Sequence, residues 1–293
     1  MAIFRYPGGK GKLLKVIRPQ IDLILKNGAT CFHEPCVGGG AVVQSVAKDF
    51  PDLQLHINDY DPEMFAFWNT VVNGAGGEID RLFELILQIP TVELFKKLRQ
   101  EKPSDIVEQA YRAIFFSRTA FSGIRTSGPL GGYNQSRQYK ITDRYLATRI
   151  IRDIQRVRFL LQGRTTVTQT SVVNYMQDME TNKAVIFIDP PYIIKGNALY
   201  PTGMSLFEHH ALSQVLKTKG NWILSYDRCQ AVMDMYDFAT RLLVPVKYSV
   251  TDYGTKRGTQ YEYLILPKDM PLSAESAAMV IESDNNIAVK LVA

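Results

Sequence analysis

The stretch from Ala184 to Tyr192 constrains the fold of this chain more than any other. Its first five residues, Ala184 to Ile188, are all apolar, which predicts a short strand buried on both faces of a sheet. Asp189 and two prolines follow, and proline cannot continue a central strand. The chain therefore leaves the sheet at a carboxylate, at the strand end where open α/β sheets bind their ligands. We predict a mostly parallel α/β sheet with a crevice beyond this strand.

The four residues that follow the strand, Asp189-Pro190-Pro191-Tyr192, suit one kind of chemistry. The exocyclic amine of a nucleobase is a poor nucleophile because its lone pair is delocalised into the ring. The Asp189 carboxylate and the Pro190 carbonyl can accept the two amine hydrogens and favour the pyramidal, reactive form. Tyr192 can stack on a base taken out of a duplex. We therefore predict that Asp189, Pro190, Pro191 and Tyr192 are the catalytic residues.

A glycine-rich loop is predicted to follow another strand. Residues 31–34 are predicted to form a short strand, residues 38–40 are three glycines, and residues 41–48 have helical periodicity. Strand, glycine turn and helix make the first unit of a nucleotide-binding crossover. The next predicted strand ends at Asp59, about 20 residues beyond the loop, where an acid can accept hydrogen bonds from ribose hydroxyls.

The strand before this loop also offers a candidate metal site. Cys31, His33 and Cys36 could ligate a metal ion. Side chains alternate along a strand, however, and no fourth ligand has the spacing of a zinc finger. We therefore predict no metal site.

The charge of the chain is unevenly spread. The whole chain carries a net charge of +5, whereas residues 96–164 contain fifteen Lys and Arg against five Asp and Glu, a net +10 that leaves −5 elsewhere. Such a basic segment is typical of a nucleic-acid-binding module, and a solvated helical face is the alternative. Residues 122–140 form a polar, glycine-punctuated loop or hairpin whose side chains are of the types that reach bases and phosphates.

The remaining pattern predicts the order of the elements. Helices are expected at about 79–88, 92–99, 106–116 and 145–161, and two antiparallel strands at 240–250 and 260–266. Residues 193–203 are a candidate lid. No apolar run approaches the roughly 20 residues of a membrane span. Three cysteines without framework spacing predict free thiols in a reducing cytoplasm.

Together these motifs resemble the Dam-type N6-adenine DNA methyltransferases. The matching segments, in the order of that family, are Tyr6-Pro7-Gly8-Gly9-Lys10, Glu34-Pro35-Cys36-Val37-Gly38-Gly39-Gly40, Asn58-Asp59-Tyr60, Ser117-Arg118-Thr119-Ala120-Phe121-Ser122-Gly123 and Asp189-Pro190-Pro191-Tyr192. The resemblance implies a Rossmann-like S-adenosylmethionine methyltransferase domain in three layers, with a mostly parallel sheet and an antiparallel final hairpin. This catalytic domain is expected at residues 1–75 and 163–267, with a mostly helical DNA-recognition insertion at 76–162. Residues 268–293 are expected to be a tail or a small hairpin.

The resemblance also implies a site and a reaction. S-adenosyl-L-methionine is expected to bind at Tyr6, Lys10, Glu34, Pro35, Cys36, Gly38, Gly40, Asp59, Tyr60, Ser171, Val172 and Asp189. Double-stranded DNA is expected to contact Arg5, Arg118, Arg125, Thr126, Tyr133, Asn134, Arg137 and Lys140. The expected reaction is methyl transfer to N6 of a flipped adenine, without a metal and away from any membrane, in a bacterial or phage-infected cell, as in restriction–modification systems. The alternatives are methylation of cytosine at N4, methylation of adenine in RNA, or a DNA-binding protein whose cofactor pocket is vestigial.

Overall fold

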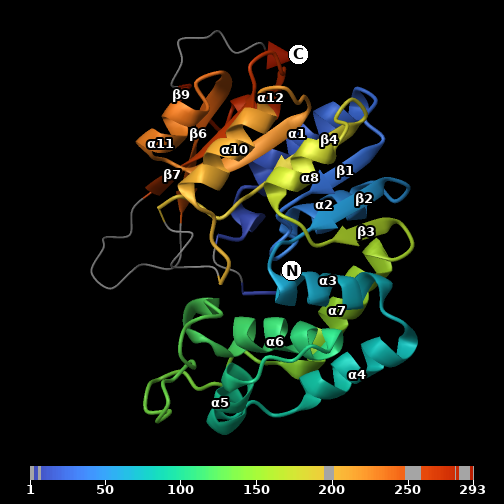
Figure 1. Cartoon of the computed structure of the whole chain (residues 1–293), viewed down its shortest axis with the longest axis vertical. Helices are drawn as coiled ribbons and strands as arrows, with labels where there is room; N and C mark the ends of the chain where they lie inside the picture. The colour runs from blue at the N-terminus through green and yellow to red at the C-terminus, as the bar shows by residue number, and fades with distance from the viewer. Residues whose placement is uncertain are drawn as a thin grey trace.

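Eight strands form one mixed sheet in the order β3-β2-β1-β4-β5-β7-β6-β9 (Figure 1). The computed structural model describes residues 3–5, 8–194, 201–247, 259–280, 282–283 and 291–292. The strands are β1 Cys31–Glu34, β2 Gln54–Asn58, β3 Thr165–Thr168, β4 Ala184–Ile188, β5 Trp222–Asp227, β6 Ala239–Lys247, β7 Thr259–Pro267 and β9 Glu282–Ser283. The first five strands are parallel, and β7 is antiparallel to both β5 and β6. The predicted α/β class, with its antiparallel final hairpin, is confirmed.

The strand predicted to be buried on both faces has that position. Every residue of β4 is buried, and its side chains divide between two hydrophobic cores. Val185 and Phe187 point into one core, whereas Ala184, Ile186 and Ile188 point into the other. This alternation follows from the two-residue period of a strand.

Helices cover both faces of the sheet and make three layers (Figure 1). One face is covered by α1 Leu14–Lys26, α2 Ala41–Asp49 and α3 Pro62–Asn73, and the other by α8 Val172–Asp178, α10 Leu206–Leu216 and α11 Gln230–Met235. The order of the strands reverses between β1 and β4, since the chain continues to β2 on one side and to β5 on the other. Ligands of open α/β sheets bind at this kind of switch point. No described helix has both the length and the apolar character needed to cross a bilayer.

Four helices lie beyond α3, at the lower end of the molecule in Figure 1. They are α4 Gly76–Leu87, α5 Val92–Gln100, α6 Ile106–Thr119 and α7 Ala147–Leu161, and the 3-10 turn η2 Phe121–Gly123 follows α6. Phe95, Phe115 and Leu161 of these helices belong to the same hydrophobic core as α1 to α3. The helical segment therefore shares a core with the sheet.

The end of the chain attaches to two different elements. β9 pairs with β6, whereas β10 Leu291–Val292 pairs in parallel with β8 Leu272–Ser273. In a hairpin β9 and β10 would pair with each other, whereas here each pairs with a different strand. The remaining short helices are η1 Lys10–Lys12 and α12 Ala274–Ala277.

Candidate active site

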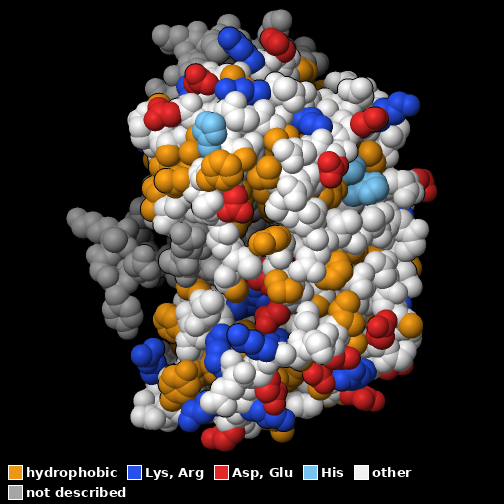
Figure 2. Space-filling view, in the orientation of Figure 1, with side chains coloured by type: hydrophobic (Ala, Val, Ile, Leu, Met, Phe, Trp, Pro, Cys, Tyr) orange, Lys and Arg blue, Asp and Glu red, His pale blue; other side chains and the backbone are white. Residues whose placement is uncertain are grey.

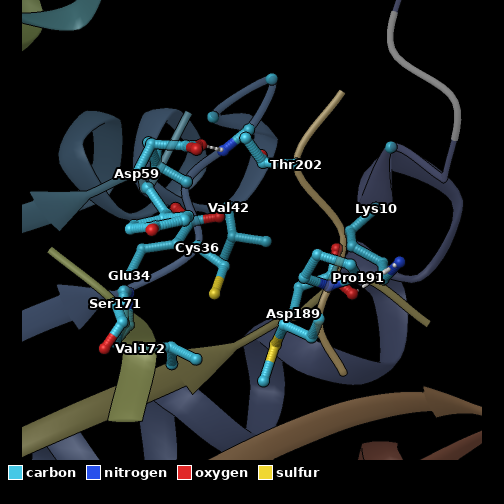
Figure 3. A pocket seen from close by; sticks show the side chains of 18 of the residues that line it. Lys10, Glu34, Cys36, Val42, Asp59, Ser171, Val172, Asp189, Pro191 and Thr202 are labelled. Atoms are coloured by element: carbon cyan, nitrogen blue, oxygen red, sulfur yellow. Dashed lines mark hydrogen bonds and ion pairs between the residues drawn. The ribbon is translucent and has the colours of Figure 1, made fainter. Parts of the chain in front are cut away.

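The carboxyl ends of β1, β2 and β4 open onto a cleft that encloses about 900 Å³, part of it open solvent (Figure 3). The predicted cofactor residues that the structure describes all line it: Lys10, Glu34, Pro35, Cys36, Gly38, Gly40, Asp59, Tyr60, Ser171, Val172 and Asp189. Tyr6 lies outside the described residues. Thr202 and Gly203, from the end of the predicted lid, line the cleft as well, together with Met204 and Glu208. Residues 195–200 of that lid are not among those described.

Asn58, buried next to the cleft residue Asp59, joins the ends of three strands. Its side-chain amide donates to the carbonyls of Pro35 at 2.8 Å and Thr170 at 2.9 Å. Its oxygen accepts from the Thr170 N–H and from the Thr168 hydroxyl, each at 2.9 Å. The side chain is fully buried. A buried amide with all of these partners is rigid, so Asn58 fixes the loops after β1 and β3 relative to each other. The sequence motif contained Asn58, but the role of this side chain depends on bonds to Thr168 and Thr170, which are more than a hundred positions away in the sequence.

The Asp59 side chain is hydrogen-bonded to the main chain of the glycine loop. Asp59 Oδ2 accepts from the Gly38 N–H at 2.9 Å, and Oδ1 accepts from the Asp61 N–H at 3.0 Å. Burial, with a further contribution from Asp61, raises the pKa of Asp59 to about 7. Trp68 Nε1 donates to the Gly38 carbonyl at 2.9 Å. Gly40 has φ +65°, and a Cβ there would meet the Trp68 ring at 2.4 Å, so only glycine fits.

Asp189 lies on the opposite side of the cleft from Asp59, next to a buried lysine (Figure 3). Lys10 Nζ is 2.9 Å from Asp189 Oδ1, and the Ser225 hydroxyl donates to the same oxygen at 2.7 Å. Lys10 also donates to the Gly8 carbonyl at 2.8 Å. Burial raises the pKa of Asp189, and the charge of Lys10 is the strongest of the opposing effects. The lysine therefore favours an ionised carboxylate in a site that would otherwise favour the acid.

Tyr192 and Glu262 complete this group. The Tyr192 hydroxyl donates to Glu262 Oε2 at 2.7 Å, and Lys10 Nζ lies 4.7 Å from the Tyr192 ring centroid and 3.9 Å from Glu262 Oε2. Glu262 is 3% exposed on β7. The sequence analysis missed Glu262 and Ser225. An acid within an otherwise apolar and aromatic strand was the available signal for Glu262. Of the other two predicted catalytic residues, Pro190 is buried and Pro191 lines the cleft.

Two arginines predicted to contact DNA are engaged inside the protein, and a third, Arg5, is partly buried. The Arg125 guanidinium, 5% exposed, pairs with Asp61 and lies 2.9 Å from Glu63. Arg118 donates to the Ile3 carbonyl, and burial lowers the pKa of Arg118 to about 10. The main-chain N–H of Arg5 donates to the Ser117 hydroxyl at 2.9 Å, and its side chain is partly buried. Four further arginines of this segment are partly buried and donate to main-chain carbonyls: Arg99, Arg112, Arg158 and Arg164.

The other residues predicted to contact DNA are exposed: Thr126, Tyr133, Asn134, Arg137 and Lys140. Three cations lie over exposed aromatic rings in this region, with Lys96 5.7 Å from the Tyr133 centroid, Arg137 5.9 Å from Phe121 and Arg144 5.2 Å from Tyr139. We call these six residues the basic-aromatic surface. Basic side chains gather around α5 and α6 in Figure 2. The sequence analysis did not name Lys96, Phe121 or Arg144 as DNA contacts, because Lys96 lies in a predicted helix and the other two lie just outside the loop predicted at 122–140.

The strand order, the antiparallel β7 and a ligand cleft at the switch point define a Rossmann-like methyltransferase. The family model of the D12 class N6 adenine-specific DNA methyltransferases matches residues 6–250. The chain therefore belongs to this family, as its motifs predicted.

Two relatives support the same assignment. The chain is similar to the Type II methyltransferase M.CviBI of Paramecium bursaria Chlorella virus NC1A, with 24% identity over 244 residues that cover 82% of this chain and 85% of the relative. It is also similar to the Type II methyltransferase M.MjaIII of Methanocaldococcus jannaschii, with 23% identity over 208 residues that cover 64% and 68%. An rRNA methyltransferase, aviRa from Streptomyces viridochromogenes, aligns over 94% of this chain and 89% of its own with 13% identity and a TM-score of 0.37, too low to argue from.

Proposed function

We propose that this protein transfers a methyl group from S-adenosyl-L-methionine to N6 of an adenine flipped out of double-stranded DNA. The observation that carries the proposal is the placement of Asp189 and Asp59 on opposite sides of one cleft. In this proposal the Asp189 carboxylate binds the target amine, and the Asp59 carboxylate binds the nucleoside of the cofactor.

The residues of the cleft fit a cationic nucleoside cofactor. Four acids line it, Glu34, Asp59, Asp189 and Glu208, against the single cation Lys10 among the lining residues that the structure describes. The glycine loop gives close access to main chain, and each Asp59 oxygen keeps a second lone pair for a ribose hydroxyl. When bound, S-adenosylmethionine supplies an electrophilic methyl group on a sulfonium.

The chain's own contribution is to prepare the amine. Lys10 and Ser225 both contact Asp189 Oδ1. In our proposal Oδ2 accepts one hydrogen of the adenine amine and the Pro190 carbonyl accepts the other. The amine lone pair then points away from the ring and can attack. The raised pKa of Asp189 suits it to hold the proton that the amine loses.

Binding of DNA is proposed to use the basic-aromatic surface. Its cations can neutralise phosphates, and its exposed rings can contact sugars or bases. Tyr192 is proposed to hold the flipped adenine by stacking, with its hydroxyl anchored by Glu262.

The test is methyl transfer from tritiated cofactor to a duplex library, followed by mass spectrometry of the nucleosides. We expect N6-methyladenine in wild type. In Asp189→Ala we expect turnover to fall at least about 100-fold, the usual size of one electrostatic contribution, while the protein stays folded by circular dichroism. Methylation of N4 of cytosine, transfer to RNA alone, or full turnover in Asp189→Ala would refute the proposal.

A further inference from the structure

A second cluster of chemically active side chains lies on the sheet, outside the cleft. Cys31 and His33 are two residues apart on β1, so they point to the same face. The register pairs His33 with His56 of β2, which adds a third side chain to that face. One ligand atom from each of Cys31, His33 and His56 lies within 4.8 Å of the other two.

This trio differs from the one that the sequence offered. Cys36 belongs to the loop of the cleft, whereas His56 comes from a neighbouring strand through the parallel register. Two ligands at positions i and i+2 of one strand, and a third opposite them, converge on one point above a sheet. The prediction of no metal was made without this cross-strand partner.

We propose that Cys31, His33 and His56 form a zinc site with one open coordination position. A thiolate and two imidazoles are ligands that zinc prefers, and a water molecule can complete the four-coordinate shell at the open position. Tetrahedral zinc places sulfur and nitrogen ligands about 3.5 Å apart, given metal–ligand bonds of about 2.3 and 2.05 Å. The ligand atoms, which lie within 4.8 Å of one another, must therefore approach by up to about 1.3 Å to hold the ion.

The surroundings specify how the ligands bind. The Tyr175 hydroxyl lies 2.7 Å from His33 Nδ1, which leaves Nε2 to bind the metal and orients the ring. The rings of His33 and His56 stack at 4.2 Å with an interplanar angle of 11°, so one ring must tilt before both can reach one ion. His56 is only partly buried and can make this rotation.

The site connects elements that shape the cofactor cleft. Cys31 and His33 lie on β1, which leads directly into the cleft residue Pro35. Tyr175 lies on α8, whose N-cap Ser171 and first residue Val172 line the cleft (Figure 3). A bound zinc ion ties β1 to β2 directly and to α8 through Tyr175. We expect it to stabilise this side of the protein rather than to act on the methyl group.

The experiment uses the untagged full chain, stripped with a chelator and titrated with Co²⁺ and then Zn²⁺. We expect one equivalent of Co²⁺ to give a thiolate-to-cobalt charge-transfer band that Zn²⁺ abolishes, and Zn²⁺ to raise the Tm. Cys31→Ser should lose the band, and His56→Gln should lose most of the affinity. Tyr175→Phe should weaken binding about tenfold or more, as outer-shell changes do.

Cys229→Ser is the matched control, because Cys229 is also a free, partly buried thiol. It should bind as wild type does. The proposal is overturned if Cys31→Ser, folded by circular dichroism, keeps the charge-transfer band, if Cys229→Ser loses it, or if no saturable one-to-one binding is observed.

Discussion

The ammonium group of Lys10 lies 2.9 Å from the Asp189 carboxylate, although the two residues are 179 positions apart in the sequence. The first described turn of the chain thus supplies the charge partner of the acid at the end of the central strand. This pairing decides the ionisation of Asp189, and the proposed reaction needs that carboxylate as a hydrogen-bond acceptor.

Lys10→Met should move the acidic limb of the pH profile of kcat/KM to higher pH. Burial raises the pKa of Asp189, and Lys10 is the strongest effect that lowers it. The pKa of Asp189 should therefore rise when the lysine is lost. At a given pH a smaller fraction of the carboxyl is then ionised. Lys12→Met, which changes an exposed lysine two residues along, is the control. An unchanged acidic limb in Lys10→Met would contradict this account.

Tyr192→Ala should weaken capture of the flipped base by about 1–3 kcal/mol, the usual contribution of one stacked base. The measurement is the fluorescence of 2-aminopurine placed at the target adenine. Tyr192→Phe keeps the ring and loses the hydroxyl that bonds to Glu262, so it should retain most of the signal. Equal fluorescence from the Ala variant and wild type would exclude the stacking role.

Asp59→Asn should change how stability depends on pH. The folded protein holds the Asp59 proton up to a pKa of about 7, whereas the reference pKa of aspartate is 3.8. The stability that this proton contributes is therefore present at low pH and is lost as pH rises from about 4 to about 7. Asparagine cannot ionise. The Tm of the variant minus that of wild type should thus be larger at pH 8 than at pH 5, and a difference that does not vary with pH would count against the raised pKa.

Gly40→Ala should destabilise the fold and weaken cofactor binding. The left-handed conformation alone costs about 1–2 kcal/mol for a residue with a Cβ, and the new Cβ meets Trp68 at 2.4 Å. Gly11→Ala is the matched control, because nothing lies within 4 Å of a Cβ built there. Chemical denaturation of both variants measures the difference. Equal stability of the two would show that the loop adapts.

Arg125→Ala and Arg137→Ala should separate a structural arginine from a DNA contact. Removing Arg125 leaves Asp61 and Glu63 without their buried partner, which typically costs about 3–5 kcal/mol of unfolding free energy. Arg137 is exposed, and its loss should change stability by no more than about 0.5 kcal/mol. If it contacts a phosphate, the salt dependence of DNA binding falls by about one unit of slope. Denaturation and filter binding over a salt series test both statements.

The parts of this structure that could be predicted are those set by local pattern. The run from Ala184 to Ile188 can only be buried, and the three glycines before Ala41 mark a close turn, so these patterns predicted the sheet and the crevice beyond β4, whereas most residues of the cleft were implied by the family resemblance. Helix positions came from periodicity and differ by a few residues at their ends.

The parts that could not be predicted depend on which residue lies opposite another. Arg125 has the same side chain whether it meets a phosphate or the carboxylates of Asp61 and Glu63, and only the fold selects between them. Glu262 reaches Tyr192 because β7 inserts beside β5, and His56 reaches His33 because of a parallel register. Neither pairing can be predicted from the spacing of these residues along the chain.

The core shared by the sheet and the helices of residues 76–162 limits how such an enzyme can be re-engineered. Helix α3 lies against α6, and Glu63 of α3 binds Arg112 of α6 at 2.8 Å. Grafting only the segment 76–162 onto another methyltransferase would leave apolar side chains on both halves without their natural neighbours. A chimera that exchanges α3 along with the segment keeps these contacts, and it is the exchange that should yield a folded protein.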